Sequence, residues 1–160
     1  MRIAVISDTH RCGKYINLAK KLIEDSVILI HLGDNIEDVE LLSNGFDGEV
    51  YAVAGNCDYS SKYPKESIIE VNGVKIFYTH GDLYGVKSTI TNIYYRGREI
   101  GADVVLFGLT HQHGIEKTDE LILMNPGSIS LPHFKGRYVG IVDIDEKGNI
   151  DPYLRELKVN

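Results

Sequence analysis

Six acidic, amide and imidazole side chains of this sequence follow apolar segments, each close to the point where a segment ends. Carboxylate, amide and imidazole groups together form the ligand set of divalent cations such as Mn²⁺, Fe²⁺, Zn²⁺ and Ni²⁺. A single residue of this kind has a structural explanation, since Asp8 suits a helix cap and Asn56 suits a turn. The recurrence after successive segments instead predicts a metal site. In chain order the six candidates are Asp8, His10, Asp34, Asn56, His80 and His111.

The apolar segments of the first half predict the strands that would bring these side chains together. Apolar runs at 2–7, 27–34 and 49–56 alternate with helical patterns at 15–25 and 36–43. This alternation is typical of a mostly parallel sheet covered by helices. The carboxyl ends of parallel strands meet at one edge of the sheet, where ligands bind. We therefore expect the candidate ligands at one common edge.

The second half is richer in strands. Asn72-Gly73 accepts the positive φ angles of a type I′ turn and predicts a hairpin between 67–71 and 74–81. We expect these strands and the later ones to form a second sheet packed on the first. Without an internal repeat or a flexible linker, residues 1–160 predict a single domain. The remaining expected elements are a helix at 87–100, strands at 104–107, 121–125, 138–144 and 153–158, and a turn at 146–149.

Charge and cysteine usage limit the classes of function. The formal net charge is −6, and no tract collects five Lys or Arg residues, which argues against binding of long nucleic acids. No apolar run approaches the ~18 residues that cross a bilayer, and the N-terminus lacks the features of a signal peptide. Cys12 and Cys57 form no CxxC pair, so we expect a reduced cytoplasmic protein. The oligomeric state stays open, a homo-oligomer included.

The candidate ligands lie in a series of short motifs. In their order along the chain these motifs resemble the calcineurin-like metallophosphoesterase superfamily, and GNCD and the later NPGS are similar to its small bacterial and archaeal phosphodiesterase branch. The resemblance covers essentially the whole chain. It implies an α/β fold, a four-layer αββα sandwich of two mixed β-sheets flanked by helices, with two metal ions at one edge. The motifs are SDTH at 7–10, GD at 33–34, GNCD at 55–58, THG at 79–81, GLTH at 108–111 and NPGS at 125–128.

The resemblance also implies a role for each candidate. Two cations ~3.5–4 Å apart would neutralise the oxygens of a small phosphodiester and lower the pKa of a bridging water, whose hydroxide is the implied nucleophile. No protein nucleophile is therefore assigned. Mn²⁺ is the favoured ion, with Ni²⁺, Fe²⁺ or Zn²⁺ as alternatives. The implied ligands are Asp8, His10 and His111 for the first ion, Asp34 as the bridge, and Asn56 and His80 for the second ion.

One ligand of the family pattern is missing. The pattern Gly-His-x-His appears here as Gly108-Leu109-Thr110-His111, so Leu109 stands where a ligand of the second ion is expected. Perturbing an outer-shell partner typically costs ~10–100-fold in metal affinity, and loss of a direct ligand should cost at least that. His113 is a candidate replacement, and the alternative is a solvated histidine at the pocket rim. We predict an impaired second site.

Other residues are expected around the ions. The resemblance places Cys57 where the wider superfamily has a histidine that assists leaving-group protonation, and Asp58 where it would orient a neighbouring imidazole. Arg11 would either pair with a phosphate or lie in solvent. His31 is expected to be a hydrogen-bonded core residue.

Two features after the last ligand differ in what they predict. NPGS at 125–128 predicts a tight turn near the site, with backbone N–H groups available to an anion. His133 stands where the branch has an arginine, so that a phosphate contact there would have to come from Lys135 or Arg137.

Two classes of function follow from these observations. The first is a metal-dependent phosphodiesterase, supported by six of the seven expected ligands. The second is a catalytically impaired protein that uses the same fold as a protein-binding scaffold, as the retromer subunit with this fold does, and Leu109 favours it. A monoesterase is a third alternative, and the lack of a dedicated basic pocket favours diesters over monoesters.

Overall fold

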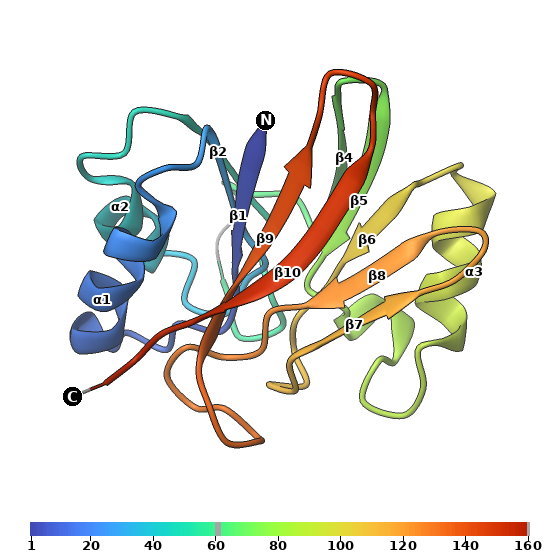
Figure 1. Cartoon of the computed structure of the whole chain (residues 1–160). Helices are drawn as coiled ribbons and strands as arrows, with labels where there is room; N and C mark the ends of the chain where they lie inside the picture. The colour runs from blue at the N-terminus through green and yellow to red at the C-terminus, as the bar shows by residue number, and fades with distance from the viewer. Residues whose placement is uncertain (60–61, 160) are drawn as a thin grey trace.

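The computed structural model describes residues 1–59 and 62–159. Strands and helices alternate through the first half of the chain, and strands predominate in the second half (Figure 1). In chain order the elements are β1 (Arg2–Ile6), α1 (Gly13–Ile23), β2 (Ile28–His31), α2 (Asp38–Ser43), β3 (Glu49–Ala52), β4 (Glu66–Val71), β5 (Val74–Thr79), the 3₁₀ helix η1 (Asp82–Tyr84), α3 (Thr91–Glu99), β6 (Val104–Leu106), β7 (Gly114–Lys117), β8 (Ile122–Asn125), β9 (Tyr138–Ile144) and β10 (Ile150–Glu156).

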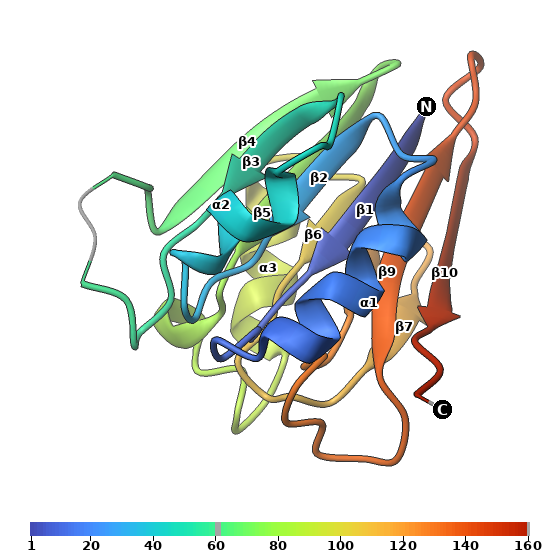
Figure 2. The ribbon, with the colours of Figure 1, turned by 90° about the vertical axis from the view of Figure 1, so that its left-hand side faces the viewer.

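Two five-stranded mixed sheets lie face to face between helices. The first sheet has the order β10-β9-β1-β2-β3, and the second has the order β4-β5-β6-β8-β7. Helices α1 and α2 cover the outer face of the first sheet, and α3 covers the outer face of the second (Figures 1 and 2). This is the four-layer αββα sandwich that the sequence predicts.

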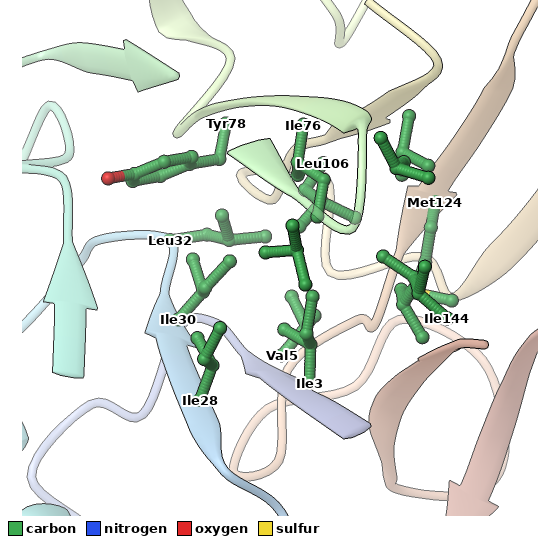
Figure 3. Packing of buried hydrophobic residues seen from close by; sticks show 14 of the residues in the cluster. Ile3, Val5, Ile28, Ile30, Leu32, Ile76, Tyr78, Leu106, Met124 and Ile144 are labelled. Atoms are coloured by element: carbon green, nitrogen blue, oxygen red, sulfur yellow. The ribbon is translucent and has the colours of Figure 1, made fainter. Parts of the chain in front are cut away.

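Alternation along the buried strands explains the layers. In β1, Ile3 and Val5 face the second sheet, whereas Ala4 and Ile6 face α1. Successive side chains of a strand point to opposite faces, so a strand that is buried on both faces is apolar throughout. The cluster between the sheets contains β-branched and leucine side chains from both of them (Figure 3).

The strand pairing places the C-terminal ends of five strands at one edge of the sandwich. Strands β1, β2 and β3 pair in parallel, as do β5 and β6. The predicted hairpin is confirmed: β4 and β5 pair across Asn72 and Gly73, whose φ angles of 50° and 78° are both positive, as a type I′ turn requires. The edge opposite this turn carries the candidate ligands.

The structure corrects two predictions about the elements and adds one strand. Strands β9 and β10 do not join the second sheet, because β9 pairs antiparallel with β1 in the first. The strand β7 is an addition, formed by a polar segment that pairs with β8 at the sheet edge. The helix predicted at 87–100 begins only at Thr91, where the Thr89 hydroxyl accepts the Thr91 N–H. None of the helices in the described residues has the length and apolar character needed to cross a membrane.

Candidate metal centre

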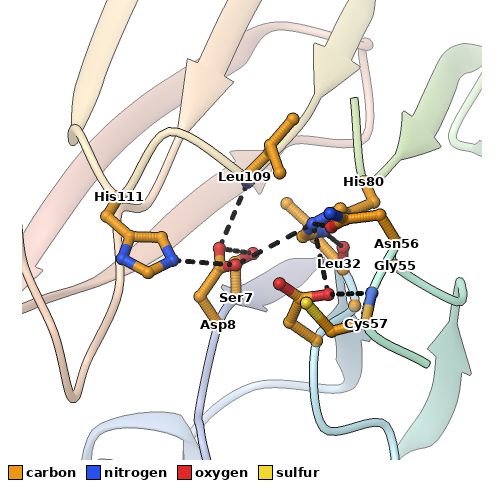
Figure 4. A network of polar contacts seen from close by, with 12 residues as sticks. Ser7, Asp8, Leu32, Gly55, Asn56, Cys57, His80, Leu109 and His111 are labelled. Atoms are coloured by element: carbon orange, nitrogen blue, oxygen red, sulfur yellow. Dashed lines mark hydrogen bonds and ion pairs between the residues drawn. The ribbon is translucent and has the colours of Figure 1, made fainter. Parts of the chain in front are cut away.

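Residues far apart in the sequence converge in two overlapping groups at the ligand edge (Figure 4). One group contains Asp8, His10 and His111, and the other contains Asp8, Asp34 and His80. Figure 4 labels Asp8, His80 and His111 of these groups. Within each group the donor atoms lie within 4.8 Å of one another. Asn56 joins the second group, since its Oδ1 lies 3.2 Å from Nε2 of His80. All six predicted ligands therefore lie in one cluster, while their role as ligands remains a prediction.

The spacing of the donor atoms suits a shared cation. Nε2 of His111 lies 3.3 Å from Oδ1 of Asp8 and 3.2 Å from Nε2 of His10. Nε2 of His80 lies 3.4 Å from Oδ1 of Asp34. Ligand atoms that each lie about 2.1 Å from one ion stand roughly 3.0–3.4 Å apart in tetrahedral or octahedral geometry. The observed distances fall in this range.

The carboxylate of Asp8 supplies the sharpest test of whether a cation fits. Asp8 is fully buried, and its Oδ1 has no hydrogen-bond partner among the described residues. Its Oδ2 accepts hydrogen bonds from the Ser7 hydroxyl and from the N–H of Leu109. A buried carboxylate oxygen without a partner is costly unless a cation neutralises it. Because Oδ1 is the atom that faces His111 and His80, the orphaned oxygen points into the candidate site.

The imidazoles are held with their Nε2 atoms directed at the site. Nδ1 of His80 lies 2.7 Å from the carbonyl oxygen of Leu32, and Nδ1 of His111 lies 2.9 Å from that of Leu131. A carbonyl oxygen only accepts, so each Nδ1 carries the hydrogen and each Nε2 of the neutral ring keeps its lone pair. Fixing one ring nitrogen through a backbone carbonyl is the usual way in which proteins orient a metal-binding histidine.

The electrostatic field of the cluster favours positive charge. Burial alone raises the pKa of Asp34, but the contact with His80 and the N–H of Cys57 offset it and lower this pKa to about 2. Burial opposes protonation of His80, yet its contacts with Asp34 and Asp8 raise its pKa above the ordinary value. The contact with Asp8 raises the pKa of His111 against its desolvation. A site that attracts protons in this way also attracts divalent cations.

The loops that carry the donors adopt unusual backbone conformations. Seven of the eight non-glycine residues with positive φ among the described residues lie in them. A left-handed conformation costs a non-glycine residue on the order of 1 kcal/mol, and such strain concentrates at functional sites. These seven are Asp8, His10, Arg11, Asp34, Asn35, Leu109 and His111.

Two glycines permit the close approach of the loops. A Cβ atom at Gly55 would lie 2.3 Å from Oδ1 of Asp34, and one at Gly108 would lie 2.0 Å from the Ser7 hydroxyl. Both distances are far below van der Waals contact. The motifs GNCD and GLTH therefore begin with glycine because another loop of the site packs directly against its Cα.

The NPGS turn lies near the site, as predicted, and braces it through side-chain hydrogen bonds. The Ser128 hydroxyl donates to the carbonyl of Asp8 at 2.7 Å, and the Asn125 amide donates to the carbonyl of Gly108 at 3.0 Å. The N–H groups of Gly127, Ser130 and Leu131 bond to side chains of the same loop. The turn thus fixes the backbone on both sides of the first donor group.

Leu109 contributes its backbone to the site and its side chain to the core. Its N–H lies 3.3 Å from Oδ2 of Asp8, while its side chain points away from the carboxylate (Figure 4). The side chain packs against the apolar cluster beneath α3, which includes Phe77 and Phe107. The side chain at this position therefore offers no atom that could coordinate a metal.

His113 stands apart from the donors. It belongs to neither group of candidate ligands within the part of the chain that the structure describes. Its ring packs against Tyr138, with centroids 4.4 Å apart, and lies edge-on to Phe134. The geometry therefore gives no support to His113 as a replacement ligand for Leu109.

The residues predicted to surround the ions have varied positions. Cys57 lines the cleft, and its N–H donates to Oδ1 of Asp34. The predicted contact of Asp58 with an imidazole is not found among the described residues. The Asp58 carboxylate instead accepts the N–H groups of Asp34, Ile36 and Gly55 and so shapes the loops. The side chain of Arg11 is 73% exposed, with Nη2 3.9 Å from Glu37, which agrees with the solvent alternative.

His31 is a core residue, as expected. Its Nδ1 accepts the N–H of Gly33 at 3.1 Å, and its Nε2 lies 3.2 Å from the Thr9 hydroxyl. Complete burial lowers its pKa to about 4, so the ring is neutral near pH 7. It supports the site by fixing the turn that leads to Asp34.

A cleft of about 710 Å³ opens over the donors. His133 lines it, whereas Lys135 and Arg137 do not, and the guanidinium of Arg137 instead stacks on Tyr15 with its Cζ 4.2 Å from the ring centroid. Sequence reasoning missed Lys87 and Gln112, which also line the cleft. The sequence predicts a helix at Lys87, and only the late start of α3 at Thr91 leaves this residue in the loop at the cleft.

Comparisons with known proteins found similar sequences and a similar fold. The model of the calcineurin-like phosphoesterase superfamily domain matches residues 1–147. The probable metallophosphoesterase YsnB of Bacillus subtilis is 39% identical over 137 residues, 84% of this chain and 79% of the relative. The phosphodiesterase MJ0936 of Methanocaldococcus jannaschii is 27% identical over 92% of this chain and 95% of its own length. The fold is also similar to that of wild-type Vps29 in complex with Zn²⁺ from Entamoeba histolytica, with a TM-score of 0.79 at 16% identity over 99% of this chain and 100% of that one.

Proposed function

The chain belongs to the calcineurin-like phosphoesterase superfamily, and from this premise we propose that it is a metal-dependent phosphodiesterase acting on small phosphodiesters. The observation that carries the proposal is the orphaned Oδ1 of Asp8, which faces two imidazoles whose Nδ1 atoms are already engaged. When bound, the cations supply Lewis acidity, which neutralises phosphate oxygens and lowers the pKa of the attacking water.

The protein's own residues hold and orient the reacting groups. Asp8 is the residue that the two donor groups share. In this proposal Asp8, His10 and His111 would hold one ion, and Asp34 would serve as a ligand of both ions, as the family pattern implies. Asn56 and His80 complete the second site. No side chain acts as the nucleophile. Lys87, at the mouth of the cleft, offers a positive charge to a phosphate oxygen.

We propose that the second site binds its ion more weakly than the first. Leu109 directs an alkyl chain into the core, and His113 packs against Tyr138, so that neither adds a donor. Asp34, Asn56 and His80 remain, and open positions for water and substrate oxygens are normal at a catalytic metal. Mn²⁺ is the ion we expect, because it accepts carboxylate, amide and imidazole donors and tolerates water in the remaining positions.

A small diester is the substrate that the cleft favours. Lys87 is the one Lys or Arg among the described residues that line the cleft, and a monoester dianion would require more positive charge. The net charge of −6 disfavours long polyanions. Both cysteines are free thiols, and a reducing compartment such as the cytoplasm suits them.

The test is hydrolysis of bis-p-nitrophenyl phosphate in the presence of Mn²⁺ or Ni²⁺. Asp8→Asn and Asn56→Ala should each lower kcat/KM by at least about 100-fold, because each removes a donor. Asp151→Asn removes an equal charge from an exposed position on β10 and should leave the rate unchanged. A wild-type rate no higher than that of the Asp8→Asn variant with either metal would refute the proposal.

The alternative function is a protein-binding scaffold, and the presence of Leu109 at a ligand position is the observation that favours it. The two functions differ in their need for metal. Metal analysis of the purified protein should find at least one bound divalent ion per chain if it is an enzyme. A chain without bound metal and without activity on added Mn²⁺ would favour the scaffold.

A further inference from the structure

A second hollow, of about 290 Å³, adjoins the candidate metal cleft. Val86, Thr110 and Gln112 line both hollows and form the ridge that separates them. The ridge is fixed, because the Thr110 hydroxyl accepts hydrogen bonds from the Asn125 amide at 2.9 Å and from the N–H of Gln112 at 3.2 Å. A substrate whose phosphate lies at the metal ligands would therefore place one ester group beside or within the second hollow.

The walls of this hollow are apolar and partly aromatic. Phe107 and Leu123 form its buried floor, and Phe134, which is 52% exposed, stands at its mouth. Aromatic rings are stacking surfaces for planar groups. The apolar lining and the size of the hollow suit a single flat ring system, since ligand pockets of 300 Å³ or more take larger molecules.

The rim of the hollow carries uncharged and acidic groups. Gln112 and Glu116 are exposed at its edge, and none of the described residues that line it is Lys or Arg. A second phosphate would meet no Lys or Arg among these residues and would be repelled by Glu116. An amide and a carboxylate can instead bond to the edge of a heterocycle that offers both donors and acceptors.

We propose that this hollow is a specificity subsite that binds the nucleobase of a nucleoside phosphodiester. The inference rests on the proposed phosphodiesterase function and specifies its substrate class. The phosphate lies at the metal ligands, the base stacks beside Phe134, and the ridge at Gln112 separates the two.

Two variants probe the subsite in opposite ways. Phe134→Ala removes an exposed wall and leaves the core untouched. Gly114→Leu should fill the hollow. Gly114 and Glu116 are two residues apart on β7, so their side chains lie on the same face of the sheet. Leu123, which pairs with Glu116 and lines the hollow, lies on this face too. A Cβ at Gly114 meets no atom within 4 Å. The control is Tyr95→Ala, an exposed aromatic on α3 that lines neither hollow.

The kinetic test compares two substrates with the same leaving group, p-nitrophenyl thymidine 5′-phosphate and methyl p-nitrophenyl phosphate. Loss of base stacking should lower kcat/KM for the thymidine ester by roughly 10-fold in both subsite variants, mainly through KM. The methyl ester should change by less than about twofold, and Tyr95→Ala should change neither. Equal losses for both esters, or a wild type that does not prefer the thymidine ester, would overturn the subsite.

A binding test separates the subsite from the chemistry. Adenosine, which carries no phosphate, is titrated into the metal-free, isotope-labelled protein while amide NMR shifts are recorded. We expect shifts at Gln112, Gly114 and Glu116 in the wild type and their loss in Gly114→Leu, whose folding is checked by its amide spectrum. Shifts with adenosine but no hydrolysis of either ester would support the subsite and refute the phosphodiesterase. Hydrolysis without these shifts would refute the subsite alone.

Discussion

The backbone N–H of Leu109 donates a hydrogen bond to Oδ2 of Asp8 across 3.3 Å, while the Leu109 side chain packs beneath α3. The position that departs from the family's ligand pattern thus still orients a proposed ligand of the first site. A backbone amide supplies this contact whatever the side chain is. In the proposed site, a leucine at position 109 therefore keeps the backbone contact with Asp8 and lacks only the side-chain donor to the second ion.

Leu109→His should restore that donor without disturbing Asp8. The residue has a φ of 66°, a left-handed conformation that histidine adopts more readily than leucine. We expect the affinity for the second Mn²⁺ to rise by at least about 10-fold, measured by competition with a chelator and by metal content. An unchanged stoichiometry would show that another group already completes the second site.

Asp8→Asn should abolish stabilisation by metal without destabilising the metal-free protein. The side-chain oxygen can keep the bonds to Ser7 and Leu109, and the amide nitrogen then faces Nε2 of His111 in place of the orphaned oxygen. Mn²⁺ at 100 times its Kd should stabilise the wild type by about 2.7 kcal/mol and the variant by nothing. Thermal unfolding with EDTA or Mn²⁺ measures both, and Asp151→Asn should behave as the wild type does.

His31 should make the metal-free protein less stable in mild acid. Its folded pKa of about 4 lies below the ordinary value of 6.5, so between these values the unfolded chain binds more protons. The contribution of neutral His31 to the free energy of unfolding is therefore fully present above pH 6.5 and decreases as the pH falls toward 4. The loss from His31 between about pH 7.5 and pH 5 should be about 2 kcal/mol.

Urea unfolding of His31→Asn in EDTA provides the comparison. The side-chain oxygen of the variant can accept the N–H of Gly33, but the variant has no imidazole to titrate. His80 and His111, whose raised pKa values act in the opposite direction, are common to both proteins and cancel. If both proteins lose the same free energy of unfolding between the two pH values, His31 is not the titrating group.

Gly55→Ala should damage the metal site and the fold together. The added Cβ would lie 2.3 Å from Oδ1 of Asp34 and 2.8 Å from its backbone nitrogen, so that the Asp34 carboxylate has to move. We expect a loss of about 1–3 kcal/mol in the free energy of unfolding and a loss of metal binding. Gly13→Ala, where a Cβ meets nothing within 4 Å, is the matched control and should retain both properties.

Much of the fold is encoded in local patterns. Asn72-Gly73 predicts its hairpin because few other residue pairs accept two positive φ angles. The apolar runs predict β1 and β2 because only a strand buried on both faces tolerates such continuity. These patterns do not show which strands pair with each other, and so the sequence predicts the wrong sheet for β9 and β10. β7 has no apolar signal, because it is a partly exposed edge strand.

The sequence by itself determined which candidate donors the site contains, because carboxylate, amide and imidazole groups can bind a cation and their motifs follow one another in a fixed order. It also determined which donor is lacking, because the alkyl side chain of Leu109 cannot bind a cation. Only the tertiary structure decided how they are used. The carbonyls of Leu32 and Leu131 set the tautomers of His80 and His111, and every residue carries such a carbonyl, so no side-chain pattern marks it. Long-range packing likewise turned His113 toward Tyr138 and left Lys87 at the cleft, because side-chain direction depends on the neighbours that the fold supplies.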